Sequence, residues 1–154
     1  MKLFIFFMIV VAISCQDDSN HGCKTNCDCP DFTTLFNDKG KEDLLFTQGG
    51  GCTFNATCKY VAQGAVQALW KDSEIETPTE TRDNFFSVID SEEPVATFDM
   101  FSLFGIICEK GAWYITKYPS GIWYWTLDSE EVSFGTAEEL DGKKSKIYYA
   151  MCFK

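Results

Sequence analysis

The sequence predicts a mainly β fold: a small antiparallel β-sandwich or open barrel stapled by disulfides, with a cysteine-rich irregular N-terminal segment. The second half of the chain consists of short runs rich in β-branched and aromatic residues. Turn sequences such as Tyr118-Pro-Ser-Gly121 and Asp141-Gly142 separate these runs, and no long segment has a convincing helical period. Eight cysteines in 154 residues indicate the covalent cross-links that small extracellular domains use.

The strand-like runs of the second half predict an antiparallel meander, because a turn signal stands between successive runs. We expect strands at 85–89, 95–103, 104–108, 112–117, 122–127 and 146–153. Residues 59–70 fit neither a period of 2 nor one of 3.6, so we expect strands interrupted near Gly64, with a helix as the alternative because of the alanines. The acidic segments 71–80 and 90–94 are predicted to be solvated loops.

The first 14 residues are predicted to be a secretory signal peptide. Lys2 precedes an unbroken apolar run from Leu3 to Ile13, and Ala12 and Ser14 are the small residues expected at a cleavage site. The run is shorter than the roughly 20 residues of a membrane span, so we expect no transmembrane segment. Residues 15–154 then form a single extracellular domain. The alternative is a bacterial lipoprotein anchored through Cys15, against which the seven further cysteines argue.

The formal net charge of −10 argues against a nucleic-acid partner, because phosphate recognition needs an excess of Lys and Arg on one face. No cofactor is expected. The triplet Gly49-Gly50-Gly51 lacks the Lys-Ser/Thr of a phosphate-binding loop, and no calcium loop is present.

The cysteines form two groups, which predicts two kinds of cross-link. Cys108 and Cys152 each lie in a strand-like run, so we expect a bridge between them. The other six are then expected to pair among themselves, in any of fifteen connectivities: Cys15, Cys23, Cys27, Cys29, Cys52 and Cys58. A metal site is the weaker interpretation, because thiols in a secretory pathway are oxidised. It would use His21, Cys23, Cys27, Cys29, Cys52 and Cys58. Asn55-Ala-Thr57 is the one glycosylation sequon and predicts a surface glycan at Asn55.

No nucleophilic triad is predicted, because the only histidine, His21, lies in the cysteine-dense leader. Paired carboxylates remain an alternative, since the chain has 23 acidic residues. Asp99 and Glu109 are the two flanked by apolar runs, and we expect Asp99 to face solvent from a strand. The favoured hypothesis is therefore a binding domain for a glycan or an extracellular protein, and the alternative is a secreted hydrolase that uses two carboxylates.

The aromatic stretch from Trp113 to Trp125 suggests where a ligand would bind. Side chains alternate between the two faces of a strand, so only one set can face the core. We expect the core-facing set to be Trp113, Ile115, Trp123 and Trp125. The outward set, and hence the candidate ligand surface, is then Tyr114, Tyr118 and Tyr124.

The order of cysteines and turn residues resembles the nematode secreted domain of unknown function 281. The residues that carry the resemblance are Cys27-Asp-Cys29-Pro30, Gly51-Cys52, Ala56-Thr57-Cys58, Ile106-Ile107-Cys108, Gly111, Trp113, Pro119, Gly121 and Cys152. The long acidic stretch between Cys58 and Cys108 departs from the family pattern. The resemblance implies a secreted, disulfide-bonded nematode domain, and it supplies no activity and no catalytic residue.

Overall fold

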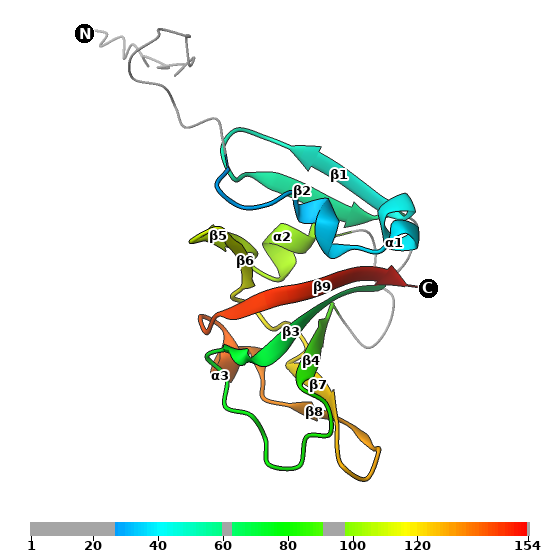
Figure 1. Ribbon diagram of the computed structural model, residues 1–154, viewed down its shortest axis with the longest axis vertical. Helices are drawn as coiled ribbons and strands as arrows, with labels where there is room; N and C mark the ends of the chain where they lie inside the picture. Colours follow the sequence, from blue (N-terminus) through cyan, green and yellow to red (C-terminus); the bar gives the residue numbers. More distant parts are fainter. Residues whose placement is uncertain (1–26, 60–62, 91–97, 154) are drawn as a thin grey trace, which may run out of the picture.

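A curved sheet of seven antiparallel strands makes up most of the computed structural model, which describes residues 27–59, 63–90 and 98–153 (Figure 1). The order across the sheet is β5-β6-β9-β3-β4-β7-β8. In chain order these strands are β3 (Gln63–Ser73), β4 (Phe85–Ile89), β5 (Ile107–Glu109), β6 (Ala112–Ile115), β7 (Ile122–Trp125), β8 (Glu131–Phe134) and β9 (Ser145–Phe153).

A two-stranded antiparallel sheet, β1 (Leu44–Gln48) and β2 (Phe54–Cys58), forms a second layer. The helices are single turns or little more: η1 (Phe32–Leu35), α1 (Asp38–Glu42), α2 (Met100–Leu103) and α3 (Ala137–Leu140). Figure 1 shows α2 between the β1–β2 hairpin and β9. Neither sheet closes into a barrel, so the predicted mainly β, sandwich-like fold is confirmed. No described helix has the length and apolar character needed to cross a membrane.

Most of the predicted strands are present, and the ambiguous segment 59–70 is also a strand over its described part. Gly64 lies inside β3 and does not interrupt it. A Cβ atom at this position would lie 2.7 Å from the ring of Phe98, so glycine is needed there because an aromatic side chain packs directly on the backbone.

The predicted strand at 95–103 is wrong over its described residues, because Asp99 starts a helix there. The Asp99 carboxylate accepts hydrogen bonds from the backbone N–H of Ser102 at 2.9 Å and of Phe101 at 3.4 Å, which caps α2. It also accepts from the N–H of Ala56 in β2 at 2.9 Å. The expected solvent-facing carboxylate is therefore a structural group that joins α2 to the small sheet. Residues 91–97 lie outside the described residues.

The predicted meander is wrong in its connectivity. β9, the last strand in the chain, lies between β6 and β3, and it pairs with β3 from Gln63↔Phe153 to Ser73↔Ser145. The C-terminal strand is thus central to the sheet. Strand propensity reports which segments are extended, whereas the position of β9 depends on its packing with strands distant in sequence.

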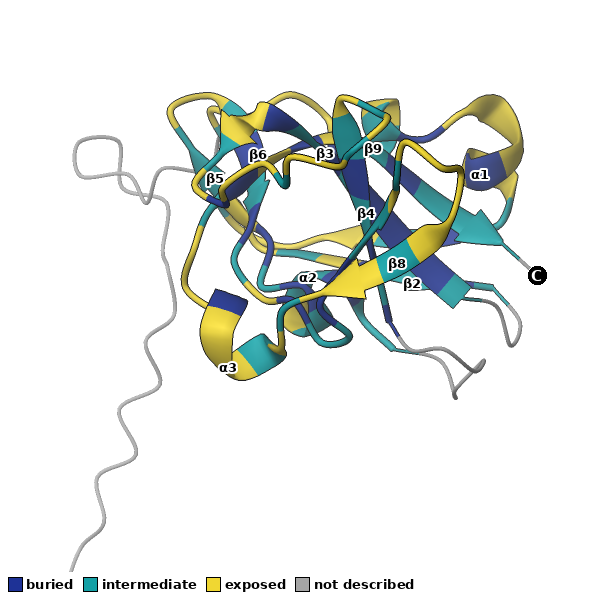
Figure 2. Ribbon diagram, turned by 90° about the horizontal axis from the view of Figure 1, so that it is seen from below, coloured by how far each residue is buried: buried dark blue, intermediate teal, exposed yellow. Residues whose placement is uncertain are grey.

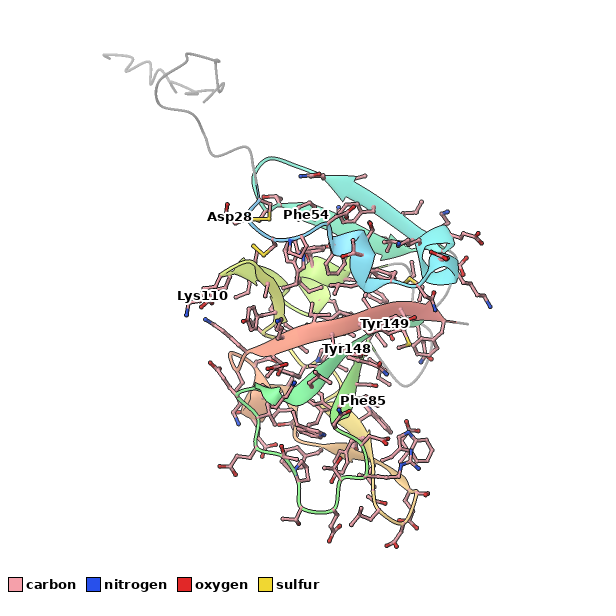
Figure 3. All side chains as sticks on the ribbon, viewed as in Figure 1. Asp28, Phe54, Phe85, Lys110, Tyr148 and Tyr149 are labelled. Carbon is pink, nitrogen blue, oxygen red and sulfur yellow. A yellow bond between two sulfur atoms is a disulfide. The ribbon has the colours of Figure 1, made fainter. Side chains whose placement is uncertain are left out.

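The part of the core that lies between the small sheet and β6 is strongly aromatic. Phe32 of η1 contacts Phe101 of α2 with ring centroids 4.7 Å apart and meets Trp113 of β6 edge-on at 5.6 Å. Phe54 of β2 lies 5.3 Å from Trp113 and stacks on Phe46 of β1 at 5.4 Å (Figure 3). Edge-to-face rings of this kind bury large apolar areas and add pairwise attraction.

Among the described residues three disulfides form: one joins the N-terminal segment to the β1–β2 loop, and two join the N-terminal segment and the small sheet to the large sheet. They are Cys27–Cys52, Cys29–Cys108 and Cys58–Cys152. The predicted Cys108–Cys152 bridge is therefore wrong, as is the confinement of the remaining bridges to the N-terminal third. Cys15 and Cys23 lie outside the described residues.

The sheet order explains why Cys108 and Cys152 do not meet. β5, which carries Cys108, is separated from β9 by β6, and β6 pairs with β9 only near Ser145 and Lys146. Cys152 lies six residues further along β9, which corresponds to ~20 Å at the rise of an extended strand. The Cα atoms of a disulfide must lie within ~7 Å of each other.

Tyr118 is completely buried, which contradicts its predicted place on an exposed ligand surface. Its hydroxyl lies 2.7 Å from Ser145 Oγ and donates to the carbonyl of Lys143 at 3.1 Å. Ser145 Oγ in turn lies 2.7 Å from Ser73 Oγ. Burial raises the pKa of Tyr118 to about 12. Tyr118 is the first residue of the turn sequence Tyr118-Pro-Ser-Gly121, but its ring packs inside the core.

We expect the Cys58→Ala/Cys152→Ala double variant to lose roughly 4 kcal/mol or more of unfolding free energy, because this bridge closes the longest loop of the three described bridges and so removes the most entropy from the unfolded chain. Its sequence separation is 94, against 25 for Cys27–Cys52. The matched control, Cys27→Ala/Cys52→Ala, should lose roughly 3 kcal/mol. Urea unfolding of both variants measures this, and a larger loss in the short-loop variant would contradict the assignment.

Tyr118 also predicts a loss of stability at alkaline pH. The folded-state pKa of about 12 exceeds the ordinary value of 10.0, so the unfolded chain loses this proton before the folded chain does. The contribution is complete below pH 10 and is lost as the pH rises from about 10 to about 12. Tyr118→Phe should show a shallower decline of unfolding free energy over this window. Equal declines in the two proteins would show that Tyr118 is not held neutral.

Candidate functional site

The orientation of β7 determines which aromatic side chains are available to a ligand. Trp123 pairs with Ser87 of β4, whose neighbours Phe86 and Val88 are fully buried on the core side. Residues directly opposite each other in a sheet share a face, so Trp123 lies on the outer face. Tyr124 points the other way and meets Trp70 edge-on at 5.7 Å. The predicted orientation of β7 is therefore reversed.

The predicted tyrosine surface does not form. Tyr118 is buried, and Tyr124 packs on the core side. Tyr114 is half-buried on β6, where it pairs with Ile107 and Lys146 far from β7 in the strand order. Trp113 and Ile115 are buried as predicted, whereas Trp125 is 38% exposed. The structure thus places the accessible rings of this stretch on the tryptophan side of β7.

A shallow groove of about 440 Å³ lies on the outer face of the large sheet. We call it the outer groove. It spans five adjacent strands, and its lining consists of Gln63, Ala65 and Gln67 of β3, Ser87 and Ile89 of β4, Trp123 of β7, Glu131 of β8, and Met151 and Phe153 of β9.

The groove exists because small side chains occupy the middle of the face and large ones its sides. Ser87 pairs with Gln67 on one side and with Trp123 on the other. Ala65 pairs with Met151 of β9 and with Ile89 of β4. In Figure 3, Tyr149 and Phe85 mark β9 and β4, the two strands that flank β3. The low centre is therefore a direct result of strand register.

Polar groups in the groove are few and defined in position. The amide nitrogen of Gln67 donates to Ser87 Oγ at 3.2 Å, which orients both side chains. Glu131 is the one charged residue in the described lining. The indole nitrogen of Trp123 is buried and has no hydrogen-bond partner among the described residues.

The two carboxylates singled out in the sequence lie apart from this groove. Glu109 forms an ion pair with Lys144, which lowers the pKa of Glu109 and raises that of Lys144. Asp99 caps α2 and binds the backbone of β2. Asn55 is exposed on β2, and its amide, with the nitrogen turned toward Asp99, donates to that carboxylate at 2.7 Å. Neither carboxylate faces a second one across the outer groove.

A sulfur cluster near β5 tests the metal interpretation. The sulfur atoms of Cys27, Cys29 and Cys108 lie within 4.8 Å of one another. Each of them belongs to a disulfide here, so none is a thiolate that could bind a metal ion. Cys52 and Cys58, which the predicted metal site also included, are in disulfides as well, and its remaining members, His21 and Cys23, lie outside the described residues.

Sequence reasoning missed most of the groove, because β3 and β9 were not recognised as its walls. Gln63 and Gln67 alternate with buried Gly64 and Val66, and Met151 and Phe153 follow the same spacing on β9. That period of two is the signal that could have identified them. The period identifies one face of each strand, but only the cross-strand register shows that these residues lie beside Ser87 and Trp123.

Comparison with known proteins gives one match. A search of curated proteins and a search of solved structures each found nothing similar. A family model described as "TRA-1 regulated protein R03H10.4" matches residues 25–152, which includes all three disulfides. That description names no activity and no ligand, and the family is a nematode family of unknown function. Because the match covers most of the sequence, the chain belongs to the family of the TRA-1 regulated protein R03H10.4.

Proposed function

We propose that the protein is a secreted, disulfide-stabilised binding domain that holds an uncharged glycan in the outer groove. The observation that supports this is the combination of the half-buried ring of Trp123 with the amides of Gln63 and Gln67 and the hydroxyl of Ser87 in one lining. A sugar presents an apolar C–H face and a rim of hydroxyls, which suits an aromatic ring beside amide and hydroxyl groups.

The charge of the site favours a neutral ligand over an anionic one. The described lining includes no Lys, Arg or His, and Glu131 adds a negative charge. The whole chain carries a formal charge of −10. A sulfated or sialylated glycan would therefore meet repulsion at close range and at a distance.

Secretion is part of the proposal, and it is supported by the apolar N-terminal run and by the disulfides, which persist in oxidising compartments. The nematode family favours this interpretation over a bacterial lipoprotein anchored through Cys15. The narrower resemblance to the domain of unknown function 281 is compatible with the family and belongs to the same proposal. A glycan attached at Asn55 would lie on the small sheet and leave the outer groove open.

A glycan array probed with the labelled mature protein tests the proposal. We expect neutral oligosaccharides to bind, and Trp123→Ala to weaken that binding about thirtyfold, as expected when an aromatic anchor is lost. The control is Tyr148→Ala, because Tyr148 is 61% exposed and does not line the groove. This control should bind like the wild type, with an unchanged melting temperature.

Two results would count against the proposal. One is that no neutral glycan on the array binds, which would favour an extracellular protein as the ligand. The other is binding that Trp123→Ala leaves unchanged, because the ligand would then lie elsewhere on the surface. Turnover of a glycoside substrate would favour the hydrolase alternative.

A further inference from the structure

β8 is an end strand of the large sheet, and no other described strand pairs with its outer edge. The N–H of Thr126 donates to the carbonyl of Glu130 at 2.8 Å, which sets the alternation of hydrogen-bonded pairs along the β7–β8 hairpin. In that alternation, the N–H and C=O groups of Glu131 and Ser133 point away from β7. Figure 2 shows β8 as mostly exposed. The edge therefore offers unpaired main-chain groups to an incoming strand.

Apolar side chains flank this edge on both faces of the sheet. Trp125 is 38% exposed and pairs with Glu131 on the outer face. Phe134 is 44% exposed and pairs with Ile122, on the opposite face. Leu127, at the hairpin turn, is 66% exposed. The side chains of an added strand would alternate between the same two faces and meet this apolar surface.

The charges around the edge are acidic and are not balanced by salt bridges within the described residues. Asp128, Glu130 and Glu131 take part in none of the three salt bridges found there. Arg82, the nearby cation, pairs with Asp83 at 3.1 Å, lies over the ring of Trp125 at 5.3 Å and donates to Ser129 Oγ in the hairpin turn at 3.3 Å. Arg82 is one cation beside three carboxylates, so the edge stays acidic. A basic segment would therefore gain favourable electrostatic interactions here.

The strand at the other end of the sheet, β5, has an edge that is protected, in contrast to the edge of β8. β5 is three residues long, and the Cys29–Cys108 disulfide attaches the N-terminal segment to it. Its acidic residue, Glu109, is paired with Lys144 and Lys110. The β8 edge has neither a covalent attachment nor charge compensation among the described residues.

From these contrasts we propose that the β8 edge docks an extended, basic peptide segment of a partner protein, which adds to the sheet as a strand. A second copy of this chain is disfavoured as the occupant. Two-fold pairing of β8 with itself would bring the same carboxylates together, and each chain has a formal charge of −10. The docking site is independent of the outer groove apart from Glu131, which belongs to both.

Fluorescence anisotropy with two labelled octapeptides tests this inference, one alternating lysine with valine and one alternating glutamate with valine. We expect the basic peptide to bind at least about tenfold tighter than the acidic one, and less tightly as salt is added. Ser133→Pro should weaken it at least about fivefold, because proline removes the outward N–H without breaking a bond to β7. Ser133→Ala keeps that N–H and should bind within about twofold of the wild type.

The Asp128→Asn/Glu130→Gln variant is a second test that leaves the main chain intact. It should also bind the basic peptide more weakly than the wild type. The inference is overturned if the basic peptide does not bind at about millimolar concentration, or if Ser133→Pro folds normally and binds it unchanged. Equal binding of the acidic peptide would also overturn it. So would a homodimer that Ser133→Pro dissociates, because the edge would then belong to a second copy.

Discussion

The covalent attachment of the small sheet to the large one is the constraint on which the rest of the structure depends. A two-stranded hairpin such as β1–β2 is marginal in water and needs another layer to cover it. Cys58–Cys152 joins the end of β2 to β9, an interior strand of the large sheet, and Cys29–Cys108 joins the N-terminal segment to β5. These bridges hold the hairpin over one face of the large sheet, so the aromatic core around Phe32 and Trp113 can form between them.

Covering one face leaves the other free for function. The helix α1 lies beside Met151 and Phe153 at one end of the outer groove. The groove itself lies on the face of the large sheet opposite the buried core, and the outer edge of β8 is paired with no described strand. They differ in chemistry: the groove combines a tryptophan with amides and a hydroxyl, whereas the edge offers main-chain groups beside carboxylates. A rigid, cross-linked sheet suits both, because binding then costs little ordering of the protein.

The sequence predicts much of the fold's local structure and little of its pairing. The strand at 85–89 and the one predicted at 122–127, which ends at Trp125, follow from β-branched and aromatic runs. The inward face of Trp113 and Ile115 follows from alternation. Alternation alone cannot say which face of β7 is buried, since both faces carry rings. That choice depends on β4, where Ser87 is opposite Trp123. Likewise, the disulfide partners depend on the insertion of β9 between β6 and β3, which no local pattern reveals.

Peptide mapping of the protein without reduction is the most direct test of how the small sheet is attached, because it identifies which cysteines join the two layers. We expect one cross-linked peptide pair containing Cys29 and Cys108, and another containing Cys58 and Cys152. A peptide pair linking Cys108 to Cys152 would contradict this expectation. The small sheet would then have no covalent attachment to β9, and the assignment of the open face would lose its basis.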